Sequence, residues 1–205
     1  MIVILDYGVG NLLSIKNMFK KTGNNNVLIS NNLEDVKSAN KIILPGVGHF
    51  DYGMLKLKES GLIDILQKKC LVDNTPILGI CLGAQLLTNG SEEGNSNGLG
   101  FINAETIKFK PELMNEILPV PNMGWCPTKT VGHTLMTNNL LDIQKYYFVH
   151  SYHMACFDSS NILFESEYGY KFTSGIFTNN IFGVQFHPEK SHKYGMKIIE
   201  NFSNL

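Results

Sequence analysis

The sequence predicts an α/β fold with a central, mostly parallel sheet, helices on both faces and added antiparallel strands in its second half. Short apolar runs alternate with helical patterns through the first half, which is typical of right-handed β–α–β crossovers. Those runs have almost no polar side chains, as expected of strands covered on both faces. In the second half the runs become short, aromatic and β-branched, with turn residues between them.

Each element of the first half has its own signal. The strands are expected at 2–6, 26–30, 41–46 and 76–81. Residues 11–23 place apolar side chains at helical spacing, and Gly23 is a suitable helix stop. Residues 52–71 also have a helical pattern, which Gly61 interrupts, and residues 82–90 form a further helix that ends at Gly90.

The second half is expected to add antiparallel strands to the sheet. These are residues 105–109, 145–152, 162–167, 173–178 and 181–187. The chain returns to helix over residues 192–205, and the polar, glycine-rich segment 89–100 is expected to be a mobile loop. No repeat or linker divides the 205 residues, so we predict a single domain over residues 1–205.

Composition excludes several classes of protein. The formal net charge is −1, which argues against nucleic acid as the main partner. There is no signal peptide pattern and no apolar run of the roughly 20 residues that cross a bilayer. The four cysteines are widely spaced without a Cys-x-x-Cys pair, which favours reduced thiols in a cytoplasmic protein.

One cysteine lies between two glycines at a strand-to-helix junction, in the stretch Gly79-Ile80-Cys81-Leu82-Gly83. Such glycines permit a sharp turn that raises the central side chain above the sheet edge. The helix N-terminus stabilises a thiolate there, and the next amide, that of Leu82, can donate to an oxyanion. A buried structural cysteine with incidental glycines explains the stretch equally well, so the stretch alone leaves both interpretations open.

A base for this cysteine is found in 185-QFHPEKS-191, directly after an apolar run. His187 and Glu189 are two residues apart and therefore point the same way in an extended chain, while Pro188 restricts the backbone between them. A carboxylate beside an imidazole holds its tautomer and stabilises the imidazolium. Each residue alone is most simply a surface residue, but with Cys81 they form a Cys-His-Glu set.

The turn 45-PGVGHF-50 follows a central strand and is rich in glycine. A loop at the carboxyl edge of a parallel sheet borders the ligand crevice. The amides of Val47 and Gly48 can there bind an oxyanion or a carboxylate. The alternative is an ordinary strand-to-helix turn, and we interpret His49 as a simple loop histidine.

Cofactor and metal sites have little support. Gly8-Val9-Gly10 follows the first strand, but Leu13 takes the place of the third glycine in a dinucleotide fingerprint. The sequence has no phosphate loop and no H-E-x-x-H motif, and its histidine pairs lack helical i, i+4 spacing. We therefore predict no cofactor and no metal.

Six motifs together carry a family resemblance. The stretches 79-GICLGAQ-85, 45-PGVGHF-50 and 185-QFHPEKS-191 resemble the class I, triad-type glutamine amidotransferases. The stretches 6-DYGVGNLLS-14, 122-NMGW-125 and 147-YFVHSY-152 resemble the glutaminase subunits of imidazole glycerol phosphate synthases within that class. The resemblance covers nearly the whole chain and implies a flavodoxin-like class I glutaminase fold.

The resemblance also implies the chemistry. Cys81 would attack the side-chain amide of L-glutamine, with His187 carrying the proton and Glu189 orienting it. The amides implied to hold the oxyanion, after rearrangement of the 45–48 loop, belong to Val47, Gly48 and Leu82. The implied glutamine-binding residues are Gly48, Gln85, His150, Ser151 and Tyr152.

In that family the ammonia passes to a separate (β/α)₈-barrel cyclase subunit, in a heterodimer that serves histidine biosynthesis. The implied interface residues are Asn122, Trp125, Tyr147 and Lys190. The family usually has His-Met-Gly-Trp-Asn where this chain has Asn122-Met123-Gly124-Trp125-Cys126, and both changed positions are expected to border the partner surface.

Two alternatives follow. One is a paralogous glutaminase that supplies ammonia to a sugar amidotransferase of surface-glycan biosynthesis. The other is a non-glutaminase member of the same fold, such as a peptidase or a chaperone-like protein.

Overall fold

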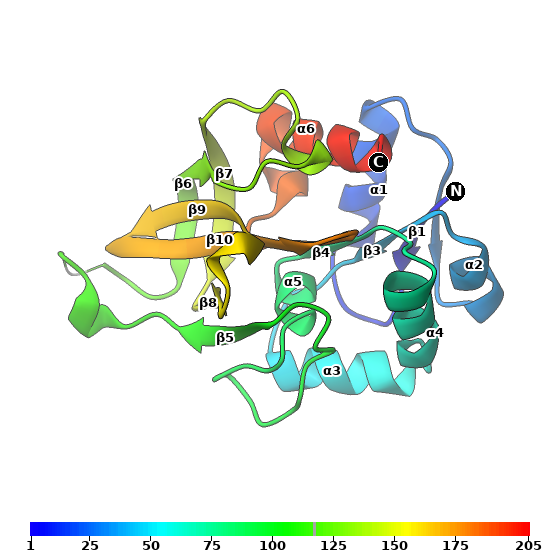
Figure 1. Cartoon of the computed structure of the whole chain (residues 1–205), viewed down its shortest axis with the longest axis horizontal. Helices are drawn as coiled ribbons and strands as arrows, with labels where there is room; N and C mark the ends of the chain where they lie inside the picture. Colours follow the sequence, from blue (N-terminus) through cyan, green and yellow to red (C-terminus); the bar gives the residue numbers. More distant parts are fainter. Residues whose placement is uncertain (117) are drawn as a thin grey trace.

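The computed structural model describes residues 1–116 and 118–205 and has one mixed sheet (Figure 1). Its strands lie in the order β2-β1-β3-β4-β11-β10-β9-β6-β7, and β8 joins β5 to β10. The parallel part contains β1 (Ile2–Leu5), β2 (Val27–Ser30), β3 (Lys41–Leu44), β4 (Ile77–Ile80) and β11 (Ile181–Val184). The antiparallel part contains β5 (Ala104–Lys108), β6 (Asn122–Thr130), β7 (Ile143–His150), β8 (Tyr152–Cys156), β9 (Ile162–Tyr168) and β10 (Tyr170–Thr178).

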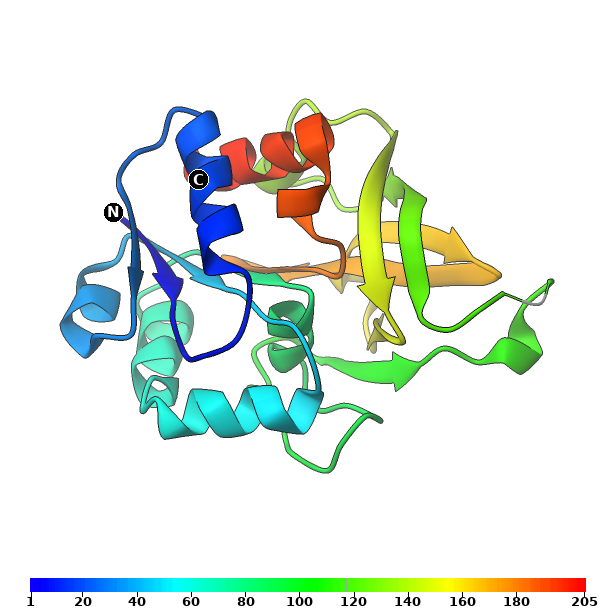
Figure 2. The same ribbon diagram turned by 180° about the vertical axis from the view of Figure 1, so that it is seen from behind.

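Helices cover both faces of the parallel part (Figures 1 and 2). On one face lie α1 (Leu12–Lys21) and α6 (His192–Ser203), and on the other lie α2 (Leu33–Ser38), α3 (Phe50–Glu59), α4 (Ile63–Gln67) and α5 (Leu82–Leu86). Successive side chains of a strand point to opposite faces. Accordingly, Ile2 and Ile4 of β1 join the core under α1 and α6, while Val3 and Leu5 join the core under α3 and α5.

Most expected elements of the first half are confirmed. The helix expected over 52–71 is divided at Gly61, whose φ is +69°, into α3 and α4, and a π-helical turn (Lys68–Val72) follows. The helix expected over 82–90 is shorter, because α5 ends at Leu86 and Thr88 donates its hydroxyl to the Gln85 carbonyl. The sequence pattern did not predict the short helix α2.

The strand expected at 181–187 is present as β11. The expectation that it pairs only with antiparallel neighbours was wrong for one of its two neighbours. It pairs antiparallel with β10 and parallel with β4, so it completes the parallel part of the sheet. Its four residues are all buried, which is typical of a strand covered on both faces. The strand expected at 145–152 is divided at Ser151 into β7 and β8, and the sequence pattern did not predict β6.

The strand-to-helix junction at Cys81 is a close contact between backbones. A Cβ on Gly83 would collide with the carbonyl oxygen of Leu44, and one on Gly79 would lie 2.6 Å from the carbonyl oxygen of Gly83. Only glycine permits this approach. Cys81 itself has φ +54° and ψ −112°, a conformation that non-glycine residues rarely adopt.

The glycine-rich segment 89–100, expected to be a mobile loop, is fastened to the start of α3. The carboxylate of Asp51 accepts hydrogen bonds from the amides of Asn95 and Ser96. The carboxylate of Glu93 accepts one from the amide of Phe50, at 2.8 Å. These contacts hold the segment against the first turn of α3.

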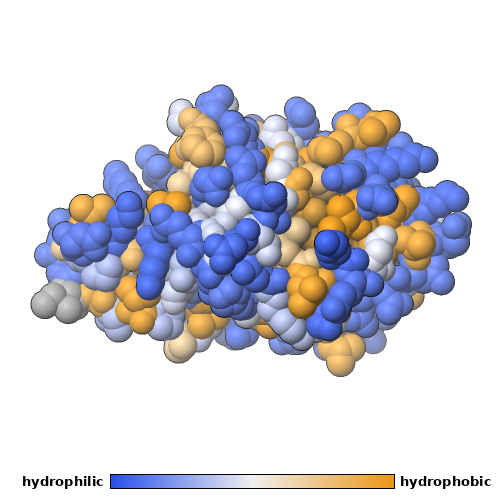
Figure 3. Space-filling view, turned by 90° about the horizontal axis from the view of Figure 1, so that it is seen from below, coloured by the Kyte–Doolittle hydropathy of each residue, from blue (hydrophilic) through white to orange (hydrophobic). Residues whose placement is uncertain are grey.

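Seen from the side of α3 and β5, the surface is mostly hydrophilic, with apolar side chains in several separate patches (Figure 3). Among the described residues, no helix has the length and apolar character that crossing a membrane requires.

We expect Gly83→Ala to destabilise the fold by about 3 kcal/mol, because the added methyl group meets a backbone carbonyl that cannot move aside. Urea unfolding followed by circular dichroism measures this free energy. Gly90→Ala is the matched control, since its Cβ would meet the flexible Glu105 carboxylate at 3.3 Å and the Ser96 carbonyl oxygen at an ordinary contact distance of 3.9 Å. Equal unfolding free energies for the two variants would contradict the close contact.

Candidate active site

A cavity of about 480 Å³ opens at the carboxyl ends of β3, β4 and β11. In an open α/β sheet this edge is where ligands bind. The wall is formed by the loop after β3, the junction at Cys81, the end of β7 and the segment 89–100. The lining residues are Val47, Gly48, His49, Cys81, Leu82, Gln85, Glu93, Pro121, Val149, His150, Ser151, Tyr152 and His187.

Cys81 lies at the floor of this cavity, with 7% of its surface exposed. Its amide donates to the carbonyl of Val184 at 2.8 Å, which ties the junction to β11. Leu82 is the first residue of α5, so no earlier turn of the helix supplies an acceptor for its amide. The junction thus places a thiol and a free amide together, the arrangement that nucleophilic attack on a carbonyl requires.

His187 and Glu189 form a buried pair beside Cys81. The Nδ1 atom of His187 lies 2.7 Å from Oε1 of Glu189, and each side chain is 2% exposed. Burial opposes the charged imidazolium, but the Cys81 sulfur and the Glu189 carboxylate outweigh it and raise the pKa of His187 above its ordinary value. Nε2 of His187 has no hydrogen-bond partner among the described residues, so this nitrogen is free to exchange a proton with the thiol or a ligand.

The backbone of His187 is held against β7. Its amide donates to the carbonyl of Tyr147 at 2.9 Å. The hydroxyl of Ser191 donates to the His187 carbonyl at 2.7 Å and accepts from the Tyr147 amide at 2.9 Å. The position of the imidazole therefore depends on strand β7.

The loop after β3 is held in place at its first residues and exposed to solvent at its last ones. The hydroxyl of buried Tyr7 donates to the Pro45 carbonyl, and Gly46 packs so closely on the junction that a Cβ would lie 2.6 Å from the Gly83 nitrogen. Val47 and Gly48 are exposed, and their amides donate no hydrogen bond to the described part of the chain. Both amides are thus available to an oxyanion.

All five residues expected to bind glutamine line the cavity: Gly48, Gln85, His150, Ser151 and Tyr152. His150 is neutral, because burial lowers its pKa to about 3. Its Nδ1 lies 2.7 Å from the Tyr152 carbonyl, an obligate acceptor, so this nitrogen carries the proton. Nε2 of His150 then accepts from the side-chain amide of Asn122 at 3.1 Å.

Two residues of the cavity lining were not expected from the sequence: Glu93, which it did not single out, and His49, which we interpreted as a simple loop histidine. One carboxylate oxygen of Glu93 accepts from the amide of Phe50, and the residue lines the cavity. His49 is the N-cap of α3, since its Nδ1 accepts from the amide of Asp51 at 3.2 Å. Glu93 lies in a polar loop without periodicity, so no local pattern separates it from its neighbour Glu92.

Three of the four expected interface residues gather on the surface next to His187. Trp125 is 45% exposed and pairs across strands with Tyr147, with 6.2 Å between the ring centroids. Lys190 places its Nζ 5.6 Å from the Tyr147 ring centre. His192, which the sequence did not suggest, stacks on Trp125 at 5.6 Å.

Asn122 requires a correction. Its side chain is 2% exposed and bonded to His150, so it cannot contact a partner at the protein surface. Cys126, the second position expected to border the partner surface, is also buried, and its thiol donates to the Glu167 carbonyl. The alternation of side chains along β6 turns both residues inward, while Met123 and Trp125 face outward.

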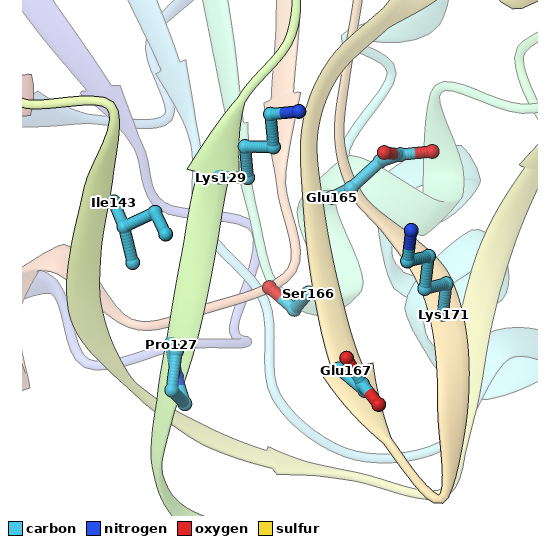
Figure 4. A pocket seen from close by; sticks show the side chains of 7 residues that line it. All are labelled: Pro127, Lys129, Ile143, Glu165, Ser166, Glu167 and Lys171. Atoms are coloured by element: carbon cyan, nitrogen blue, oxygen red, sulfur yellow. The ribbon is translucent and has the colours of Figure 1, made fainter.

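A second, smaller cavity of about 180 Å³ lies on the antiparallel part of the sheet and shares no residue with the first. Figure 4 shows lysines and glutamates from β6, β9 and β10 around it. Its lining residues are Pro127, Lys129, Ile143, Glu165, Ser166, Glu167 and Lys171. None of its described lining residues is a cysteine or a histidine, whereas Cys81 and His187 both line the first cavity.

The chain is similar in sequence to known proteins over its whole length. The family model described as glutamine amidotransferase class-I matches residues 3–204. The imidazole glycerol phosphate synthase subunit HisH 2 of Methanococcus maripaludis is 54% identical over 202 residues, which are 98% of each chain. The subunit of the same name from Pseudomonas aeruginosa is 43% identical over the full length of both chains.

Solved structures show the same fold at lower identity. A glutamine amidotransferase from Thermotoga maritima superposes with a TM-score of 0.62 at 17% identity, covering 99% of this chain and 82% of that one. The glutaminase domain of Trypanosoma brucei CTPS with bound acivicin has a TM-score of 0.65 at 15% identity, covering 99% and 93%. These likenesses confirm the flavodoxin-like glutaminase fold expected from the sequence.

We expect Glu189→Gln to lower the pKa of His187 by about one unit or more, because it removes the charge that stabilises the imidazolium. Histidine NMR titration measures this pKa, with His187→Gln for assignment. A raised folded-state pKa stabilises the fold below the unfolded value of about 6.5 and ceases to do so as pH rises through the folded value. Glu189→Gln should therefore destabilise the protein most at mildly acidic pH.

His150 serves as the internal control in the same spectra, because its pKa of about 3 has a different cause, burial. If His187 titrated at the same pH in both proteins, the proposed influence of Glu189 would be wrong.

Proposed function

The chain belongs to the class I glutamine amidotransferase family, and we propose that it is the glutaminase subunit of an imidazole glycerol phosphate synthase. It would hydrolyse L-glutamine and pass the ammonia to a (β/α)₈-barrel cyclase partner in histidine biosynthesis. The observation that carries the proposal is the convergence of Cys81, His187 and Glu189 on one cavity. Its full-length relatives carry the name of that subunit.

The chemistry follows from the positions of these groups. The Cys81 thiolate attacks the side-chain carbonyl carbon of glutamine, and the Leu82 amide with those of Val47 and Gly48 holds the developing oxyanion. Nε2 of His187 gives its proton to the departing ammonia, which leaves a glutamyl thioester. Water then attacks the thioester with His187 accepting its proton, and glutamate leaves as the Cys81 thiolate is restored beside the protonated imidazole.

The cavity wall offers acceptors for the substrate's ammonium group. The amide nitrogen of Gln85 is occupied by donation to Gln185 and to the Tyr152 carbonyl, which leaves its carbonyl oxygen for a ligand. Glu93 adds a carboxylate to the same cavity. We assign these two residues, together with His150, Ser151 and Tyr152 of the same cavity lining, to recognition of the amino-acid part of glutamine.

The partner surface is proposed to include Trp125, Tyr147 and Lys190. Tyr147 links this surface to the catalytic centre, because its carbonyl accepts from the amide of His187. A partner that moves Tyr147 therefore acts directly on the backbone of the base. The exposed Val47–Gly48 end of the loop, where Gly48 has φ +103°, is the part free to turn its amides toward the oxyanion.

The whole chain acts as one amidotransferase domain in this proposal, and the family match over residues 3–204 supports it. Cys70, Cys81, Cys126 and Cys156 are all free thiols, which suits the reducing cytoplasm. The sugar-amidotransferase alternative rests on changes at Asn122 and Cys126. Since both side chains are buried, they leave the exposed surface unaltered and favour the cyclase.

We expect Cys81→Ala to reduce partner-dependent release of ammonia from glutamine by about four orders of magnitude, as loss of a catalytic nucleophile does. The assay measures glutamate and ammonia with the chain alone and with the cyclase subunit of the same organism. Cys156→Ala is the matched control, since its thiol lies outside the cavity and the variant should keep its activity. Full activity of Cys81→Ala would contradict the proposed nucleophile, and activation only by a sugar amidotransferase would establish the alternative.

We expect Lys190→Ala to weaken cyclase binding by up to about fivefold, the range of an exposed ion pair with an acidic partner residue, and to leave the melting temperature unchanged. Isothermal titration calorimetry and the ammonia assay measure affinity and activation. Lys193→Ala is the control, because Lys193 makes a similar contact, 5.2 Å from the Tyr194 ring centre. Unchanged affinity and activation in Lys190→Ala would refute this role.

A further inference from the structure

We propose that Gln185 is a further catalytic residue, whose side-chain amide donates a hydrogen bond to the Cys81 sulfur and stabilises the attacking thiolate. The inference rests on the proposed function, because it concerns the nucleophile of that reaction. Gln185 lies two residues before His187, and Nε2 of its amide is 3.7 Å from Sγ of Cys81. This residue therefore contacts the reacting atom itself.

The register of the sheet places Gln185 beside Cys81. In the parallel pair β4–β11, Ile80 lies opposite Val184, so the next residue of each strand is also a neighbour. Adjacent strands are about 4.8 Å apart, which brings the two side chains within reach. Gln185 is 0% exposed, so water does not compete for its amide.

A chain of hydrogen bonds decides which end of the Gln185 amide faces the sulfur. The carbonyl of Tyr152 can only accept, so the group of Gln85 that lies 3.4 Å from it is the NH₂ group. The same NH₂ group lies 3.0 Å from Oε1 of Gln185. The carbonyl oxygen of Gln185 is thereby committed to Gln85, and its NH₂ group is directed at Cys81.

A hydrogen-bond donor at this place stabilises a thiolate that is buried. A charged group that is removed from water is destabilised unless hydrogen-bond donors replace the water. His187 supplies charge from one side, while its Nε2 has no hydrogen-bond partner within the part of the chain that the structure describes. The Gln185 amide is a neutral donor to the sulfur that is already in place before substrate binds.

A purely structural role for Gln185, that of holding Gln85, predicts a different result. It affects the binding of glutamine and leaves the reactivity of Cys81 toward small reagents unchanged. Iodoacetamide does not need the glutamine site, so its reaction with Cys81 separates the two roles. It also separates this inference from the proposed function, because alkylation proceeds whether or not the protein hydrolyses glutamine.

The experiment measures the rate of Cys81 alkylation by iodoacetamide from pH 5 to pH 10, with the modified peptide identified by mass spectrometry. We expect Gln185→Met, which keeps the size and removes the donor, to react about three- to tenfold more slowly at neutral pH. The whole profile should move to higher pH. Gln185→Glu should move it further, since a carboxylate repels the thiolate.

Asn201→Leu is the control for loss of a buried donor. Its amide donates to the carbonyls of Met136 and Asn138, both at 2.9 Å, far from the cavity lining, and the wild-type alkylation profile should be kept. A profile of folded Gln185→Met that superimposes on that of the wild type would overturn the proposal.

A second measurement needs no Gln185 variant and applies if those variants fail to fold. The side-chain NH₂ resonances of Gln185 should shift as Cys81 ionises in the wild type and stay constant in Cys81→Ala. Resonances that are indifferent to pH in the wild type would also overturn the proposal.

Discussion

The geometry of the candidate site depends on the approach of Gly83 to the carbonyl of Leu44, which leaves no room for a side chain between them. This contact presses the first turn of α5 onto the end of β3. The chain must then turn within one residue after β4. That residue is Cys81, whose backbone adopts a strained conformation with φ +54°. The same contact brings the Val47 and Gly48 amides to the edge where the thiol emerges. The Cys81 thiol and the amides proposed to hold the oxyanion therefore share one geometric cause.

Strand β11 couples this junction to the rest of the site. The Val184 carbonyl, at the end of β11, accepts a hydrogen bond from the Cys81 amide. Gln185 and His187 follow directly after this strand. Beyond them, the His187 backbone is bonded to Tyr147 and Ser191. The proposed nucleophile, the proposed base and the proposed partner surface are thus connected by hydrogen bonds of the main chain and of Ser191. These three parts therefore have little freedom to move independently.

The sequence was sufficient to predict the alternation of strands and helices and to single out Cys81, His187 and Glu189 as candidates, which the fold brings together, because these depend on local patterns and on a motif. It could not reveal that β11 is inserted parallel to β4, since strand pairing across about a hundred residues leaves no local periodicity. Gln185 and Glu93 were missed for a related reason. The role of Gln185 arises from the register between β4 and β11, and that of Glu93 from a contact between its loop and α3. Nothing in the sequence alone distinguishes these two residues from other glutamines and glutamates. The burial of Asn122 depends on the alternation along β6, a strand that the sequence pattern did not identify.

Asn122 shows how a departure from a family pattern can conserve a physical role. The carbonyl of Tyr152 requires the proton on Nδ1 of His150, and burial keeps that ring neutral, so Nε2 of His150 needs a donor. Asn122 supplies it from the adjacent strand. A histidine at this position, as the family pattern has, also carries a ring N–H that can donate to the same nitrogen. Asparagine and histidine therefore satisfy one requirement of the cavity wall, and the substitution lies in the interior rather than on the exposed surface.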